Sequence, residues 1–219
     1  TRIHLATLDE LTERAVRYRH LLDQGENERL ARFRFEEDRR RFLLGHGLLR
    51  DLLGKVLDQD PAEIVFHRGR YGKPYVEGYP VHFNLSDTKD AVAVALSIDL
   101  EIGLDLETMT RRVDHLSVSQ HYFTPEEQAS IASAADGKQR FLELWTRKEA
   151  VLKACGVGIM DDLRSLRVDQ ETNELMIRHP EFIAMSEAEY HLRTWHTAPS
   201  LLLSLAAARP VDFVEILHA

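Results

Sequence analysis

Hydrophobic residues recur at helical spacing in two long parts of the chain. Between residues 25 and 54, leucines and phenylalanines recur among charged clusters, which predicts two helices whose apolar side faces a core. Residues 139–154 have the same spacing, and Gly156 is expected to end that helix. A further helix is expected over residues 124–135, because Thr-Pro-Glu-Glu combines an N-cap residue, a proline at the first helical position and a capping-box glutamate.

Short runs of apolar or alternating residues predict strands elsewhere. Three follow one another at residues 81–85, 91–97 and 102–107, with polar or turn residues between them. Four more are expected, at residues 166–168, 175–177, 191–194 and 201–206. Because helices and strands do not alternate regularly, the pattern predicts an α+β fold rather than a doubly wound sheet.

The strand predicted at residues 102–107 alternates strictly between apolar and other residues. Its second face holds Gly103, Asp105 and Glu107. The Cα atoms of the two acids are expected to lie about 6.5 to 7 Å apart, and their unequal side chains can reach one Mg²⁺ ion. The alternative is the polar outer face of an edge strand, and this strand alone does not decide between the two.

The helix predicted at residues 139–154 presents Trp145, Glu149 and Lys153 at intervals of four, with Lys148 beside them. An acid and two bases therefore gather on one side. On pattern alone, an ordinary solvated Glu–Lys pair is the commoner explanation. The strand end at residues 84–87 is equally consistent with a phosphate-binding turn and with an ordinary polar turn.

Composition and charge narrow the classes of function. The 219 residues include 28 basic and 36 acidic ones, a formal net charge of −8, which argues against a surface built to neutralise nucleic acid. The longest apolar run, residues 201–208, is interrupted by Ser204 and is much shorter than the roughly 18 residues of a membrane span. The single cysteine, Cys155, fits a reducing compartment. We therefore expect a cytoplasmic protein that binds neither nucleic acid nor membrane.

Two motifs taken together resemble the signatures of the Sfp-type 4′-phosphopantetheinyl transferases. The first is Gly103-Leu-Asp-Leu-Glu107, and the second is Trp145-Thr-Arg-Lys-Glu-Ala-Val-Leu-Lys153-Ala-Cys-Gly156. Three upstream segments extend the resemblance over almost the whole chain: Arg41 before Phe-Leu-Leu-Gly45, Tyr71-Gly-Lys-Pro74, and His82-Phe-Asn-Leu-Ser86.

The resemblance implies a monomer of two similar α/β halves, related by a pseudo-two-fold axis, with coenzyme A in the cleft between them. The N-terminal half, residues 1–104, is expected to contact the adenosine and its 3′-phosphate. The C-terminal half, residues 105–219, is expected to hold magnesium and the catalytic helix. A faint repeat agrees, because Arg-Phe-Leu begins a long predicted helix at residue 41 and again at residue 140.

The resemblance also implies the site residues and the reaction. Magnesium is expected to be held by Asp105, Glu107 and Glu149. The phosphates of coenzyme A are expected to contact Lys73, Ser86, Lys148 and Lys153, and the 3′-phosphate to contact Arg41. A serine of an apo acyl- or peptidyl-carrier protein would attack the β-phosphate and release 3′,5′-ADP. Glu149 is expected to take the serine proton, and Lys153 to stabilise or protonate the leaving phosphate.

One residue departs from the family pattern. Histidine usually follows the serine of the strand end, whereas Asp87 stands here. A carboxylate repels phosphate unless it turns away, so Asp87 is not expected to bind coenzyme A. Two alternative functions stay open: a magnesium-dependent phosphohydrolase or nuclease, against which the acidic net charge counts, and a coenzyme A binding module without activity, against which the three carboxylates and Lys153 count.

Overall fold

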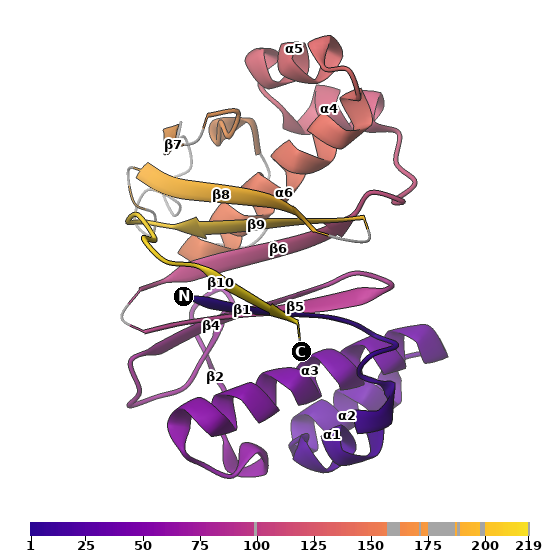
Figure 1. Cartoon of the computed structure of the whole chain (residues 1–219), viewed down its shortest axis with the longest axis vertical. Coiled ribbons are helices and arrows are strands. Elements are labelled where there is room, and N and C mark those ends of the chain that lie inside the picture. The colour runs from indigo at the N-terminus through magenta and orange to yellow at the C-terminus, as the bar shows by residue number, and fades with distance from the viewer. Residues whose placement is uncertain are drawn as a thin grey trace.

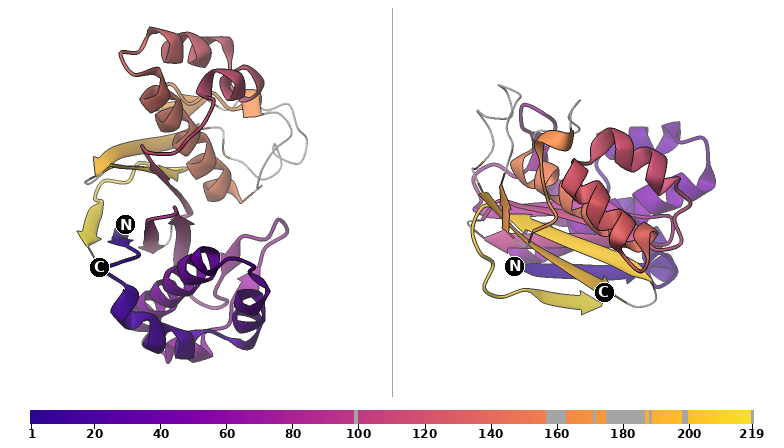
Figure 2. Two further views of the ribbon diagram at one scale, coloured as in Figure 1. Left: turned by 90° about the vertical axis from the view of Figure 1, so that its right-hand side faces the viewer. Right: turned by 90° about the horizontal axis from the view of Figure 1, so that it is seen from above.

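The computed structural model describes residues 1–98, 100–156, 163–170, 172–174, 187, 189–197 and 200–218. Its helices form the two outer layers and its sheets the two inner layers (Figures 1 and 2). The first sheet has the strand order β10-β1-β5-β4, the second has the order β6-β9-β8-β7, and β2 and β3 pair separately. The prediction of an α+β fold is confirmed.

The elements have the following bounds. The helices are α1 (Ala15–Leu21), α2 (Gln24–Arg32), α3 (Glu36–Leu57), α4 (His115–Tyr122), α5 (Pro125–Ser133) and α6 (Gly137–Cys155), with 3₁₀ turns η1 (Thr12–Arg14), η2 (Pro61–Glu63) and η3 (Leu163–Ser165). The strands are β1 (Arg2–Thr7), β2 (His67–Arg68), β3 (Pro74–Tyr75), β4 (Val81–Asp87), β5 (Ala91–Ile98), β6 (Ile102–Thr108), β7 (Thr172–Glu174), β8 (Glu189–Thr197), β9 (Leu201–Ala207) and β10 (Glu215–His218). Within the described residues, no helix has both the length and the apolar character needed to cross a bilayer.

The two halves share one topology. Each begins with a strand, β1 or β6, continues through a long helix, α3 or α6, and returns as a hairpin, β4–β5 or β8–β9. In both, the first strand pairs antiparallel with the second strand of the hairpin. The order β1-β5-β4 therefore corresponds to β6-β9-β8, which is the repeat that the pseudo-two-fold relation requires.

The boundary between the halves differs in detail from the predicted one at residues 104 and 105. Strand β6 belongs entirely to the second sheet, although the predicted boundary passes through it. Strand β10 returns to the first sheet and pairs parallel with β1, with Arg2 opposite Glu215. Strand β10 thus belongs to the sheet of the N-terminal half. The C-terminal half is therefore connected to the N-terminal half both before β6 and after β9.

Alternation along the strands explains how the layers pack. On β5, Val92 and Val94 face α3, whereas Ala91, Ala93 and Ala95 face the second sheet. The small alanines leave room for Leu104, Leu106 and the leucines of β9 in the core between the sheets. Helix α6 covers the opposite face of the second sheet, where Leu202 and Ala206 meet Phe141 and Val151.

The predicted helices are confirmed, and their ends have the expected chemistry. Helices α2 and α3 account for residues 25–54. At the start of α5, the Glu127 amide donates to Thr124 Oγ1 and the Thr124 amide donates to Glu127 Oε2 at 2.9 Å, which completes the capping box. Helix α6 ends at Gly156, whose positive φ of 72° suits glycine and whose amide donates to the Leu152 carbonyl.

Most of the predicted strands are confirmed as β4, β5, β6, β8 and β9. The strand predicted at residues 166–168 is wrong, because this segment follows η3 and bonds to helices: the Val168 amide donates to Glu127 and the Leu166 carbonyl accepts from Lys148. The strand predicted at residues 175–177 lies outside the described residues. The sequence pattern did not identify β1, β10 or α4.

A buried ion network holds α2 against α3. Arg50 is fully buried, and its guanidinium donates to Glu26, to Asp23 and to the carbonyl of Ile64. Glu26 also contacts His46 Nδ1 at 2.8 Å. Burial by itself would raise the pKa of Glu26, but the contacts with His46 and Arg50 outweigh it and lower that pKa.

This shift predicts how stability depends on pH. Because the folded-state pKa of Glu26 lies below its ordinary value of 4.5, its contribution is present above that value and is lost as the pH falls through the folded pKa. We expect Glu26→Gln to lower the free energy of unfolding at pH 7 by about 1–3 kcal/mol. Urea titrations at pH 7 and pH 4 should show a smaller difference between variant and wild type at pH 4. An equal difference at both pH values would contradict the assignment.

Candidate active site

The candidate site begins where the edge strands of the two sheets meet. Edge strand β6 has amides that no strand neighbour satisfies on that side, and side chains of β4 accept them instead. The Leu104 amide donates to Asn84 Oδ1 and the Leu106 amide donates to Ser86 Oγ, both at 3.0 Å. These bonds place Asp105 next to Ser86 and fix the two halves in register.

Gly103 allows helix α6 to lie directly on β6. A Cβ atom at this position would lie 1.9 Å from the carbonyl oxygen of Ala150 and 2.2 Å from the amide nitrogen of Ala154. Asp105 and Glu107 point to the same side as Gly103, as the alternation predicted. The close approach therefore brings both carboxylates beside the part of α6 that presents Glu149 and Lys153.

This contact leads to a prediction for Gly103→Ala. Neither α6 nor β6 can yield without moving backbone, so we expect the variant to lose at least about 2–3 kcal/mol of unfolding free energy, measured by urea denaturation. Gly69→Ala is the matched control, because a Cβ there meets nothing nearer than 3.7 Å. Equal stability of the two variants would contradict the role given to Gly103.

Asp105 is the centre of a small polar cluster. The Ser86 hydroxyl donates to Asp105 Oδ1 at 3.0 Å, and Lys153 Nζ donates to the same oxygen at 2.6 Å. Lys153 also contacts Ser86 Oγ at 3.1 Å. The side chain of Asp105 is 9% exposed and that of Lys153 is 30% exposed, so the lysine reaches the cleft while the aspartate lies beneath it.

Glu107 and Glu149 complete the group of carboxylates. Glu107 forms an ion pair with Arg111 and accepts a hydrogen bond from the Thr108 amide at 3.3 Å. Half-buried Glu149 makes no hydrogen bond or ion pair with any described residue. Burial, and then the charge of Asp105, raise the pKa of Glu149 despite Lys153 and Arg111. Burial and Asp105 likewise raise the pKa of Glu107 against the effect of Arg111.

The donor set fits magnesium in type and charge. Carboxylate oxygens are the ligands that Mg²⁺ prefers, and a divalent cation would offset the burial and the charge of Asp105 that raise the pKa values of Glu107 and Glu149. The described residues do not hold three such ligands in a ready-made cluster. Lys153 and Arg111 form ion pairs with two of the three carboxylates.

Lys148 corrects one prediction. It was expected to contact the phosphates of coenzyme A, but its side chain is 1% exposed and forms an ion pair of 2.9 Å with Glu127. It also donates to the carbonyls of Leu163 and Leu166 and lies over the ring of Phe123. One residue along a helix turns the side chain by about 100°, which carries Lys148 from the cleft into the core.

Arg41 and Asp87 form a pair at the edge of the site. Arg41 Nε lies 2.8 Å from Asp87 Oδ2, and the same guanidinium contacts Asp38 at 2.9 Å. Asp87 stands where the Sfp-type pattern has histidine, and its carboxylate forms an ion pair with the Arg41 guanidinium. Burial raises the pKa of Asp87, and Arg41 opposes that effect. Both residues line a cavity of about 540 Å³ together with Glu107 and Arg111.

Lys73 lies beside the C-terminal end of α6. It donates to the carbonyls of Ala154 at 2.9 Å and Ile102 at 3.2 Å, and forms an ion pair with Glu101. It lines a second cavity, of about 300 Å³. The structure therefore brings Asp105, Glu107, Glu149, Lys153 and Ser86 together with Arg41 nearby, whereas Lys73 lines a different cavity from Arg41 and Glu107. The predicted phosphate contacts of Arg41, Lys73 and Ser86 stay predictions.

Sequence reasoning missed two residues of the site. Asn84 lies within a quoted motif, but its role in joining the sheets depends on a neighbour that the pattern did not reveal. Arg111 binds Glu107, and its guanidinium carbon lies 5.5 Å from the centre of the Trp145 ring. The sequence feature that could have indicated Arg111 was the pair Arg111-Arg112, which closely follows the strand that holds Asp105 and Glu107.

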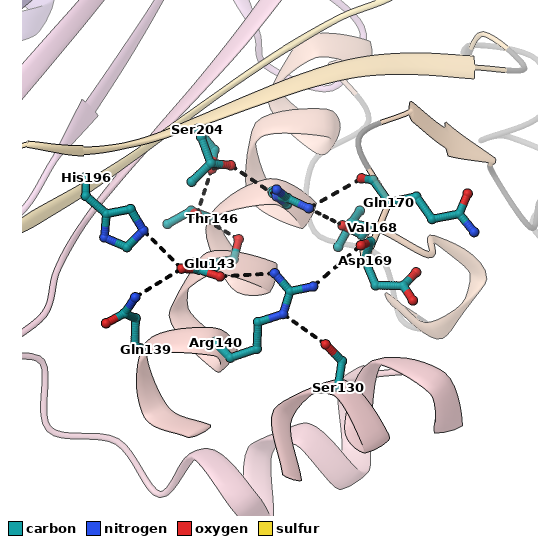
Figure 3. Close-up of polar contacts among 12 residues, drawn as sticks. Ser130, Gln139, Arg140, Glu143, Thr146, Val168, Asp169, Gln170, His196 and Ser204 are labelled. Carbon is teal, nitrogen blue, oxygen red and sulfur yellow. Dashed lines mark hydrogen bonds and ion pairs between the residues drawn. The ribbon is translucent and has the colours of Figure 1, made fainter. Parts of the chain in front are cut away.

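A polar network outside the cleft fixes the first turns of α6 (Figure 3). Thr146 and Ser204 join the helix to β9 through their hydroxyls at 2.8 Å. Arg140 donates to Ser130 of α5 at 2.9 Å, and Glu143 contacts His196 of β8 at 3.0 Å. The helix that presents Glu149 is therefore held from three elements, which limits its rotation.

Comparison with known proteins agrees with this arrangement. The family model described as the 4′-phosphopantetheinyl transferase superfamily matches residues 101–206, and that of the 4′-phosphopantetheinyl transferase N-terminal region matches residues 11–99. The chain is 36% identical to 4′-phosphopantetheinyl transferase HetI of Nostoc sp. over 63% of this chain and 61% of the relative. It is 32% identical to 4′-phosphopantetheinyl transferase psf-1 of Bacillus pumilus over 85% and 79%. It is 28% identical to 4′-phosphopantetheinyl transferase Sfp of Bacillus subtilis strain 168 over 93% and 89%.

The matched regions cover both halves of the fold. The chain therefore belongs to the 4′-phosphopantetheinyl transferase superfamily, among its Sfp-type members, which confirms the resemblance of the two motifs. The match to HetI spans 61% of that protein's length, and those to relatives from Thraustochytrium and Synechocystis span 60% and 64%.

Proposed function

We propose that this protein transfers the 4′-phosphopantetheine arm of coenzyme A to a serine of an apo acyl- or peptidyl-carrier protein and releases 3′,5′-ADP. The observation that supports this most is the meeting of Asp105 and Glu107 on β6 with Glu149 and Lys153 on α6, across the contact that Gly103 permits. The names of the relatives point to the same activity.

Asp105, Glu107 and Glu149 would hold Mg²⁺ in this proposal. When bound, the ion supplies positive charge against the pyrophosphate of coenzyme A. Burial and the charge of Asp105 raise the pKa values of Glu107 and Glu149, and a positive counter-charge at this place would offset both effects. Lys73 and Ser86 are proposed to contact the phosphates of coenzyme A and Arg41 its 3′-phosphate, whereas Lys148 is withdrawn from the phosphate contacts.

Two residues of the chain, Glu149 and Lys153, are assigned to the proton transfers of the reaction. The oxygen of the carrier serine forms a bond to the β-phosphorus, and the bond from that phosphorus to the oxygen of the departing 3′,5′-ADP breaks. Glu149, which has no hydrogen-bond or ion-pair partner among the described residues, takes the serine proton. Lys153, held between Ser86 and Asp105, stabilises or protonates the leaving phosphate.

The oligomeric state and the cellular compartment of the protein are also proposed. One chain supplies both sides of the site, so we propose a monomer. Its single free cysteine fits the cytoplasm as its compartment.

The test is to incubate the protein with coenzyme A, Mg²⁺ and apo carrier proteins and to weigh the carriers by intact mass spectrometry. We expect addition of one phosphopantetheine arm, and no addition when EDTA replaces Mg²⁺. No addition to any acyl- or peptidyl-carrier protein would refute the transferase. Hydrolysis of coenzyme A without a carrier would favour a phosphohydrolase, and binding without reaction would favour a binding module.

The variant Asp87→His tests the departure from the family pattern. It removes a partner of Arg41, so we expect transfer to be preserved and the KM for coenzyme A to fall by about threefold. Asp38→Asn, which removes the other acidic partner of Arg41, is the matched comparison. Loss of transfer in Asp87→His would show that Asp87 is itself needed.

A further inference from the structure

Two of the three carboxylates of the site are already neutralised by cations of the same chain. Lys153 Nζ lies 2.6 Å from Asp105 Oδ1, and Arg111 forms an ion pair with Glu107 Oε1. Glu149 has no such partner among the described residues. The site thus holds two positive charges of its own against three negative ones, and a divalent cation has to enter among them.

The two cations are held in different ways. Lys153 extends from the rigid helix α6 and has a second contact, with Ser86. Arg111 extends from the segment after β6, is 35% exposed, and otherwise contacts the ring of Trp145. Among the described residues, the Arg111 guanidinium has no hydrogen bond or ion pair other than the one with Glu107, so Arg111 has one polar contact to give up where Lys153 has two.

The surroundings of Arg111 give it a place to move. Its side chain lines the cavity of about 540 Å³ that Arg41, Lys89 and Arg112 also line. The second oxygen of Glu107, Oε2, accepts a hydrogen bond from the backbone amide of Thr108. A backbone amide cannot move away from its acceptor as a flexible side chain can. Oε1, the oxygen that Arg111 occupies, is therefore the one that a metal ion can gain by displacing a side chain.

We propose that Arg111 is an internal counter-ion that competes with Mg²⁺ for Glu107 and so sets the metal affinity of the site. A guanidinium and a divalent cation need the same lone pairs and repel each other, so occupancy by one excludes the other. The inference rests on the proposed magnesium site, but it concerns binding by the protein alone and does not depend on which carrier is modified.

The experiment measures Mn²⁺ binding to the protein by electron paramagnetic resonance, without coenzyme A or carrier. We expect Arg111→Ala to bind Mn²⁺ about tenfold more tightly than wild type, and Arg111→Lys to lie between them. Arg112→Ala is the matched control: it removes the same charge from the same cavity, but Arg112 has no contact with Glu107 among the described residues. It should stay within about twofold of wild type.

The double variant Arg111→Ala/Glu149→Gln shows whether the tighter Mn²⁺ binding occurs at the proposed site. We expect it to lose that tighter binding, because it lacks the proposed ligand Glu149. Unchanged or weaker Mn²⁺ binding by Arg111→Ala would overturn the inference and leave the proposed function standing. Equal tightening in Arg112→Ala would also overturn it, since the effect would then be general electrostatics. If wild type and all variants bind no Mn²⁺, the metal site of the proposed function fails, and the inference fails with it.

Discussion

Replacing Lys148 by methionine is expected to lower the free energy of unfolding by about 3–5 kcal/mol, measured by urea denaturation at pH 7. The variant keeps the length of the side chain but leaves the carboxylate of Glu127, which is fully buried, without its cation. Among the described residues, the amides of Val168 and Thr124 are then the hydrogen-bond donors that remain to that carboxylate. Breaking a buried ion pair from one side costs more than the pair itself contributes, because the remaining charge stays out of water.

Two companion variants make this prediction specific. Adding Glu127→Gln to Lys148→Met should restore part of the lost stability, because the unpaired charge is then gone. Lys55→Met is the surface control, since Lys55 also pairs with a carboxylate, that of Asp51, but is 66% exposed, and the loss of stability should stay within about 1 kcal/mol. If Lys148 bound phosphate instead, the KM for coenzyme A would rise while stability would hardly change.

Replacing Glu149 by glutamine is expected to lower kcat/KM for transfer by about 10³-fold or more, measured by the rate of carrier modification. The substitution keeps the shape of the side chain and removes both a proposed metal ligand and the proposed base. Stability should not fall with it. The raised pKa of Glu149 means that folding disfavours its charged form, so at pH 7 the neutral amide relieves burial and the repulsion from Asp105.

Glu143→Gln is the matched control on the same helix, because the pKa of Glu143 is lowered whereas that of Glu149 is raised. Burial alone would raise the pKa of Glu143, but hydrogen bonds from Arg140 and Gln139 lower it. The substitution should therefore cost stability at pH 7 and leave kcat/KM within a few-fold of wild type. A loss of activity in Glu143→Gln as large as that in Glu149→Gln would contradict the assignment of roles along α6.

The contrast between Lys148 and Glu149 shows how far pattern reasoning reaches. The spacing of Trp145, Glu149 and Lys153 predicted one helical side correctly, because 3.6 residues per turn is a property of the helix alone. Which side faces the cleft depends on partners distant in sequence, Glu127 on α5 and Gly103 on β6. Lys148 was placed wrongly because an adjacent residue in sequence points into a different environment.

The same division holds for the strands. Strict alternation over residues 102–107 predicted that Asp105 and Glu107 share a face, since side chains of a strand point to opposite sides in turn. Strands β1 and β10 were missed, because they are recognised by pairing with each other and with β5 rather than by a local pattern. The resemblance placed Ser86 and Lys153 in the site, but the sequence did not predict that they bond directly to Asp105, from which they lie 19 and 48 residues away.

The sequence by itself determined the start of α5, the end of α6, the face of β6 that holds two carboxylates, and the family, because capping, alternation and motif spacing are local properties of the chain. Only the tertiary structure decided that Asn84 and Ser86 join the two sheets, that Lys148 belongs to the core, and that Arg111 occupies Glu107. The physical reason is that the energy of a buried charge or an unpaired amide depends on what lies against it after folding.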